Sequence, residues 1–157
     1  MHCHYNSNYK YNQINEIMRE IRYRGIGIAE RKWVFGSLWF DTRNKATLIW
    51  SEELKYWVRV DPATVGQYTG LKDEHGKEIY EGDVIRSPLS EDKTRPHRIF
   101  YHTGNAAFMG ALVDRKELCY LRLDQDWIYK FGKEVIGNIH DNPELIEKQT
   151  AERHKTN

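Results

Sequence analysis

The sequence has little of what several classes of protein require. Its 157 residues include only two cysteines, Cys3 and Cys119, whose separation fits neither a metal-binding nor a redox motif. Such sparse cysteine is typical of a reducing compartment. No stretch is long and apolar enough to span a membrane, and the N-terminus lacks the apolar core of a signal peptide. We therefore expect a cytoplasmic protein that makes no membrane contact.

The sequence also lacks an excess of charge of either sign. Its 24 basic and 23 acidic residues leave a net charge of +1. A protein dedicated to non-specific DNA binding is usually clearly basic, so the overall charge argues against that class. A local basic face remains compatible with this balance.

Motifs that carry catalytic chemistry are absent as well. The sequence has no phosphate-binding glycine loop, no Gly-x-Ser-x-Gly and no His-Glu-x-x-His. The Gly-x-Gly at Gly25–Gly27 lacks the third glycine of a dinucleotide site. The seven histidines are scattered, and the ligands of His2-Cys3-His4 are best interpreted as a chance grouping. We expect no enzymatic activity, no cofactor and no metal.

Aromatic residues, in contrast, are abundant, with five Trp and ten Tyr, and they favour strands. Alternating apolar residues between turn signals predict about nine short strands and little helix, which indicates an all-β barrel or sandwich. The expected strands span residues 21–23, 32–40, 47–50, 56–60, 84–85, 97–102, 105–113, 118–123 and 135–139. Short helical segments are expected after Asp61, over residues 124–132 and after Asn142.

The expected strand at residues 32–40 is apolar on both faces. Trp33, Phe35 and Trp39 alternate with a second apolar set, formed by Val34, Leu38 and Phe40. A strand of this kind needs cover on both sides. We expect it to lie in the middle of the core or at a subunit interface.

Two turns organise the stretch from residue 65 to residue 86. Aspartate beside glycine is typical of a turn, because Asp accepts backbone hydrogen bonds and Gly adopts positive φ. The expected structural turn residues are Gly66, Gly70, Asp73, Gly76, Gly82 and Asp83. The alternative is that Asp73 and Asp83 are catalytic acids.

Three motifs resemble the YopX family of phage and prophage proteins. They are Met-x-x-Ile-basic-aromatic-Arg at Met18–Arg24, a glycine-rich motif ending in Ile-Tyr-Glu-Gly-Asp at Val65–Asp83, and Val-Ile-Gly-Asn-Ile with Asn-Pro-Glu-Leu at Val135–Leu145. At His140 the chain departs from the family pattern, which usually has an aromatic residue there.

The resemblance implies an SH3-like small β-barrel for the core. Together with the strand pattern, it leads us to expect a mainly β fold with extra antiparallel strands and a short C-terminal helix. It also implies a location in the host cell and a family whose biochemical role is unassigned. We expect a YopX-like domain over residues 18–147, preceded by a polar extension at residues 1–17 and followed by a charged tail at residues 148–157.

Basic and aromatic residues interleave before this central stretch, and they form the candidate binding surface. Its members are Arg22, Arg24, Arg31, Lys32, Trp33, Trp39 and Trp57. Exposed tryptophans favour a protein contact, whereas a thick aromatic core would bury them. Arginines beside aromatics fit nucleic acid, unless they pair with Glu20, Glu30 and nearby acids. The sequence predicts a non-enzymatic interaction module that self-associates or binds a phage or host protein, with a nucleic-acid-binding β-barrel as the alternative.

Overall fold

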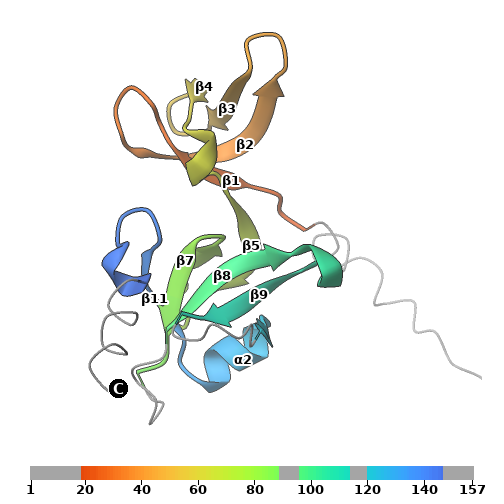
Figure 1. The fold of residues 1–157 in the computed structure, drawn as a ribbon, viewed down its shortest axis with the longest axis vertical. Helices are drawn as coiled ribbons and strands as arrows, with labels where there is room; N and C mark the ends of the chain where they lie inside the picture. Colours follow the sequence, from red (N-terminus) through yellow and green to blue (C-terminus); the bar gives the residue numbers. More distant parts are fainter. Residues whose placement is uncertain (1–18, 89–95, 114–119, 147–157) are drawn as a thin grey trace, which may run out of the picture.

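A computed structural model of the 157-residue chain describes residues 19–88, 96–113 and 120–146. These residues form two antiparallel sheets (Figure 1). The predicted N-terminal extension and charged tail, together with Cys119, lie outside the described residues.

The first sheet has the strand order β4-β3-β2-β1-β5-β6. Its strands are β1 (Tyr23–Ile26), β2 (Trp33–Asp41), β3 (Ala46–Ser51), β4 (Tyr56–Arg59), β5 (Gly66–Lys72) and β6 (Glu78–Tyr80). A 3-10 turn, η2 (Pro62–Thr64), connects β4 to β5, and Asp61 caps it by accepting a hydrogen bond from Ala63 N. The predicted helical turn after Asp61 is therefore confirmed.

The second sheet has the order β10-β9-β8-β7-β11. Its strands are β7 (Asp83–Arg86), β8 (His97–His102), β9 (Ala107–Leu112), β10 (Tyr120–Arg122) and β11 (Glu134–Asn138), with η3 (Thr103–Asn105) and α2 (Gln125–Lys130) between them. The prediction of a mainly β fold is confirmed. Both sheets are open in strand order, so the SH3-like barrel is not confirmed.

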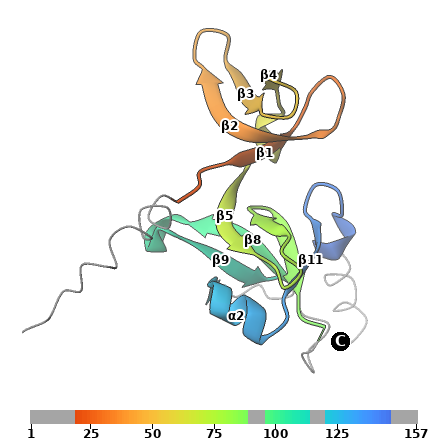
Figure 2. The ribbon, with the colours of Figure 1, turned by 180° about the vertical axis from the view of Figure 1, so that it is seen from behind.

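The ribbon separates into an upper lobe of β1–β4 and a lower lobe of β5–β11 with α2 (Figures 1 and 2). The upper lobe has a small core of Val34, Ile49 and Val60. A bridge between Gly27 and Val60 brings the end of β4 back to the end of β1. The first strand was predicted at residues 21–23, but β1 spans Tyr23–Ile26 and continues through Gly25. A Cβ atom at Gly25 would lie only 3.2 Å from Val60, so the missing side chain permits close packing.

The lower lobe holds the larger core. Its buried members are Ile79, Ile85, Ile99, Phe108, Leu123 and Ile128. Helix α2 contributes Ile128, and Asp124 caps the helix by accepting a hydrogen bond from Trp127 N at 2.8 Å. The predicted helical segment at residues 124–132 is therefore confirmed.

Within one copy of the chain, strand β2 is not covered on both faces, so the prediction that residues 32–40 lie in the middle of the core is wrong. Val34 lies in the upper core and Leu38 packs against it. Trp39 and Phe40 are exposed, although they alternate along the strand as expected. The upper lobe is one curled layer, and no described element packs over the other face at Trp39. The other position predicted for this strand, at a subunit interface, stays a prediction.

Candidate functional site

Three tryptophans form a row across one side of the upper lobe. Register pairs Ser37 with Trp50 and Trp50 with Trp57, so Trp39, two residues from Ser37, lies on the same face. The ring centroids of Trp39 and Trp57 lie 5.6 Å apart, as do those of Trp50 and Trp57. Trp39 is 50% exposed and Trp57 is 42% exposed. We call these three residues the outer aromatic face.

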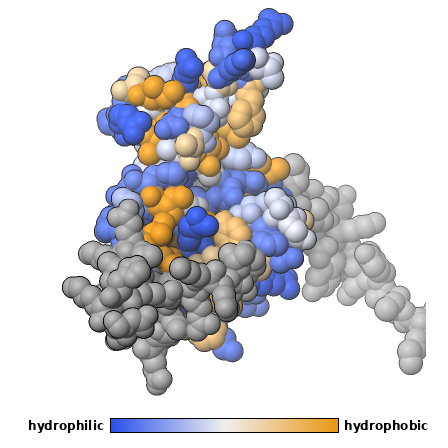
Figure 3. All heavy atoms as spheres, viewed as in Figure 1, coloured by the Kyte–Doolittle hydropathy of each residue, from blue (hydrophilic) through white to orange (hydrophobic). Residues whose placement is uncertain are grey.

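A groove of about 680 Å³ lies on the side of β4 that carries Tyr56 and Val58, and Trp57 connects it to the outer aromatic face because Trp57 lines it as well. It runs between the turn at residues 27–32 and the segment of residues 51–59, which includes β4. Its apolar lining includes Ile28, Val34, Leu54, Tyr56 and Val58. The space-filling view shows hydrophobic residues on both lobes, several of them on the upper lobe (Figure 3). Exposed apolar surface of this extent typically marks a site of interaction.

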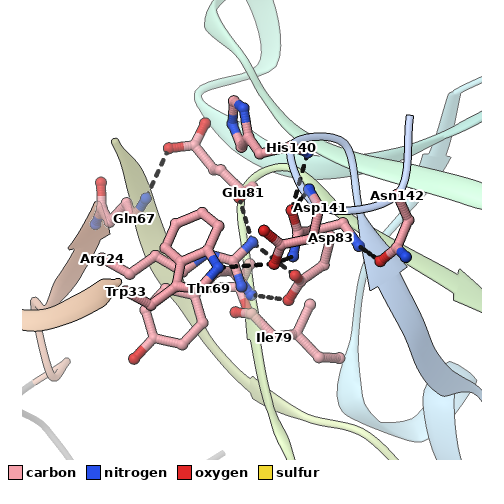
Figure 4. Close-up of polar contacts among 12 residues, drawn as sticks. Arg24, Trp33, Gln67, Thr69, Ile79, Glu81, Asp83, His140, Asp141 and Asn142 are labelled. Atoms are coloured by element: carbon pink, nitrogen blue, oxygen red, sulfur yellow. Dashed lines mark hydrogen bonds and ion pairs between the residues drawn. The ribbon is translucent and has the colours of Figure 1, made fainter. Parts of the chain in front are cut away.

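Arg24 occupies a different place, at the junction of the two lobes (Figure 4). Its guanidinium forms an ion pair with Asp83 at 2.6 Å and donates to the Glu81 carbonyl at 3.1 Å. It also lies over the rings of Trp33 and Tyr80, at 4.7 and 5.0 Å from their centroids. Arg24 is only 8% exposed, so it cannot contact an external phosphate.

Residues of the third motif, Val135–Leu145, also form part of this junction. Trp33 Nε1 donates to Asp141 Oδ2 at 2.7 Å, and Asn138 Nδ2 donates to the same oxygen at 2.7 Å. Burial alone would raise the pKa of Asp141, but these hydrogen bonds and the charge of Arg24 outweigh it and lower that pKa. Burial, followed by the charge of Arg24, lowers the pKa of His140. The junction thus joins residues from all three sequence motifs.

The two buried carboxylates of the central motif, Asp73 and Asp83, stabilise the fold through hydrogen bonds and an ion pair. Asp83 is 1% exposed, with Oδ1 paired to Arg24 and Oδ2 accepting from Tyr80 N at 2.8 Å. Burial raises the pKa of its carboxyl against the opposing effects of Arg24 and the Tyr80 N–H. Asp73 accepts from three backbone N–H groups, those of His75, Lys77 and Val135. A substrate has no access to carboxylates held in this way.

Four glycines of the central stretch lie where the backbone has a positive φ or where another part of the backbone comes too close for a side chain. Gly70, Gly76 and Gly82 have φ of +85°, +83° and +84°. At Gly66 a Cβ atom would lie 2.6 Å from the Glu81 carbonyl oxygen. These positions favour glycine because a side chain would be strained or would clash.

The structure thus divides the predicted binding surface among four places. Trp39 and Trp57 lie together, whereas Arg24 and Trp33 are at the lobe junction. Arg22 pairs with Glu20 and Glu78 and lies over the ring of Tyr68. Arg31 and Lys32 are exposed in the turn at residues 27–32.

The sequence reasoning missed the groove residues Leu54 and Tyr56 and the junction residues Asn138 and Asp141. The alternation of Tyr56 and Val58 with Trp57 was the available signal for the groove. The local signal for the junction was weaker. Asn138 lies near the end of the last predicted strand and accepts from the N–H groups of His140 and Asp141, which is typical of a turn.

One group of side chains has the composition of a metal site. His75, Glu74 and Glu134 place ligand atoms within 4.8 Å of one another. Glu134 is also 3.5 Å from Arg86, whose positive charge opposes a bound cation.

Among the described residues, no helix combines the length and apolarity needed to cross a membrane.

Comparison with known proteins relates the chain to a protein family and to solved structures. The family model described as "YopX protein" matches residues 4–147. The crystal structure of protein EF1440 from Enterococcus faecalis is similar, with 26% sequence identity and a TM-score of 0.55. The similarity covers 82% of this chain and 99% of that one. No protein with a curated description matches.

Proposed function

The chain belongs to the YopX family, as its three motifs predicted, and from this premise we propose that it is a cytoplasmic, non-enzymatic interaction module of phage or prophage origin. Its partner is a second copy of itself. The contact is made by the outer aromatic face and the adjoining groove.

The exposure of Trp39 and Trp57 is the observation that carries this proposal. A Trp side chain buries up to about 250 Å². At about 25 cal/mol per Å², burying the exposed half of one Trp contributes roughly 3 kcal/mol. Two such residues side by side supply the apolar centre that a stable interface needs.

The non-enzymatic part of the proposal is supported by the use of the motif acids. Asp73 and Asp83 are buried and engaged by backbone N–H groups or Arg24. A general acid or base must reach the proton that it transfers. These two residues have no such access.

The nucleic-acid alternative has less support from the geometry. Arg24 is buried, and Arg22 pairs with two glutamates. Arg31 and Lys32 are left exposed, and two cations give a small phosphate-binding footprint.

Size-exclusion chromatography with light scattering tests self-association across a range of concentrations. We expect the wild-type mass to rise from 18.7 kDa toward twice that value. Trp39→Ala should weaken this association at least tenfold, because the lost contact is worth more than the roughly 1.4 kcal/mol of one decade. Tyr129→Ala is the matched control, since Tyr129 is 57% exposed but lies on α2 of the lower lobe. A wild-type protein that stays monomeric at its highest attainable concentration would refute the proposal.

A further inference from the structure

The turn between β5 and β6 and the start of β11 bring three side chains with metal-binding atoms together. Glu74 and His75 lie in this turn, and Glu134 is the first residue of β11. Their ligand atoms all lie within 4.8 Å of one another. We call these three residues the ligand cluster. Because β5 and β6 belong to the first sheet and β11 to the second, the ligand cluster lies where the two sheets meet.

Backbone contacts hold the two segments side by side. Glu74 N donates to the Lys133 carbonyl at 3.0 Å, and Val135 N donates to Asp73 Oδ2 at 3.1 Å. These two hydrogen bonds lie on either side of the glutamate of β11. The Asp73 carboxylate also accepts from His75 N at 2.9 Å. The backbone that carries each ligand is therefore fixed by the fold, as a preorganised site requires.

The distances within the ligand cluster fit the coordination of zinc. His75 Nε2 is 3.4 Å from Glu74 Oε1 and 3.7 Å from Glu134 Oε2. Zinc binds nitrogen and carboxylate oxygen at about 2.0–2.2 Å, usually as a tetrahedron, in which neighbouring ligand atoms are about 3.4 Å apart. Both distances from the imidazole are close to that value. The His75 side chain is 68% exposed, which leaves a path for the ion and room for water as a fourth ligand.

The charges at the ligand cluster also favour a cation. The side chains of Glu74 and Glu134 are only 25% and 26% exposed, so two carboxylates of like charge lie close together with little water around them. Within the described part of the chain, Glu74 forms an ion pair with His75 alone, and histidine is mostly neutral above pH 7. Arg86 contacts Glu134 through Oε1, whereas Oε2 is the oxygen near His75. Arg86 therefore balances one of the two negative charges and leaves the other.

We propose that Glu74, His75 and Glu134 form a zinc site. Imidazole and carboxylate together suit zinc, whereas calcium and magnesium prefer oxygen ligands. The ion joins the turn between β5 and β6 to β11 and so stabilises the lower lobe. No metal was expected from the sequence; Glu134 lies 59 positions after His75, and only the fold brings the two together. The site is separate from the outer aromatic face, so this inference does not depend on the proposed self-association.

Zinc titration of the full chain, by isothermal calorimetry and by thermal melting followed by circular dichroism, tests this site. Every protein measured carries His2→Ala, Cys3→Ser and His4→Ala, which remove competing ligands near the N-terminus. We expect this parent protein to bind one zinc ion per chain and to melt at a higher temperature, because the ion binds the folded state. EDTA should reverse the rise, and magnesium at the same concentration should cause a smaller one.

Four variants locate the ion. His75→Ala and Glu134→Gln should each weaken zinc binding at least tenfold, since each removes a ligand. Arg86→Gln should instead tighten zinc binding, because the lost positive charge opposes the ion. Glu53→Gln is the matched control, since Glu53 is an exposed glutamate of the upper lobe, and it should bind zinc like the parent protein. Melting without zinc verifies that each variant folds.

Three results would overturn the proposal. The first is a parent protein that neither binds zinc nor gains stability in a roughly hundredfold molar excess of the ion. The second is zinc binding by His75→Ala and Glu134→Gln that equals that of the parent protein, since the ion would then lie elsewhere. The third is a magnesium effect as large as that of zinc, because the imidazole would then not be a ligand.

Discussion

Replacing Arg24 with Met tests whether the ion pair at the lobe junction holds the fold together. Met keeps much of the length and apolar volume of the Arg stem but removes its charge and donors. Asp83, which is 1% exposed, would keep the Tyr80 N–H as its hydrogen-bond partner among the described residues. The stacking of Arg24 on Trp33 and Tyr80 would also be lost.

The expected loss is about 3–5 kcal/mol of the free energy of unfolding. This range applies when one partner of a buried ion pair is removed and the other charge stays uncompensated. Small domains are stable by only about 5–15 kcal/mol, so the loss is a large fraction of the total. Removing both charges, in Arg24→Met with Asp83→Leu, should cost less than the two single changes added together, because no buried charge is then left alone.

Urea unfolding followed by circular dichroism and Trp fluorescence measures these values. Four of the five tryptophans lie in β2–β4 of the upper lobe, and Trp127 lies in α2 of the lower lobe. Arg43→Met is the control, and it should remain within about 0.5 kcal/mol of wild type because Arg43 is exposed. The reasoning fails if Arg24→Met costs less than about 1 kcal/mol, or if the double variant equals the sum of the single ones within error.

Two further perturbations, of the backbone and of pH, follow from local geometry. Gly36→Ala should prevent folding or cost more than about 3 kcal/mol, because its Cβ atom would lie 1.8 Å from the Trp50 carbonyl oxygen at a φ of +149°. Gly70→Ala should cost only about 1–2 kcal/mol, since its φ of +85° is strained for alanine but nothing lies within 4 Å; equal losses in the two variants, measured by urea unfolding, would contradict this account. The free energy of unfolding should also decrease in two steps as the pH is lowered. The pKa of His140 is lowered in the folded chain, so below the ordinary value of about 6.5 the unfolded chain gains the proton first. The stability from Asp141, whose pKa is also lowered, is present above about pH 4 and is lost as pH falls through its lowered value. His140→Gln should flatten the first step and leave the second, and an unchanged first step would exclude His140 as its source.

The sequence by itself determined the positions of most strands and turns. Alternation located β2, β8 and β9, because side chains on a strand point to opposite faces in turn. The cap at Asp61, the helical segment over residues 124–132 and the turn at Asp73 could be predicted because each depends on contacts within a few residues. The motifs also identified the family correctly.

The tertiary structure decided which of these residues are available for function. Alternation shows that Trp39 shares a face with Phe35, but whether that face is covered depends on elements distant in sequence. In the same way, Arg24 and Arg31 are both basic residues near aromatics, yet only Arg24 meets Asp83, which lies 59 positions further along the chain. Local patterns place a side chain on a face of its strand, whereas burial and ion pairing depend on how the lobes pack. The outer aromatic face and the ligand cluster therefore emerge only from the folded chain.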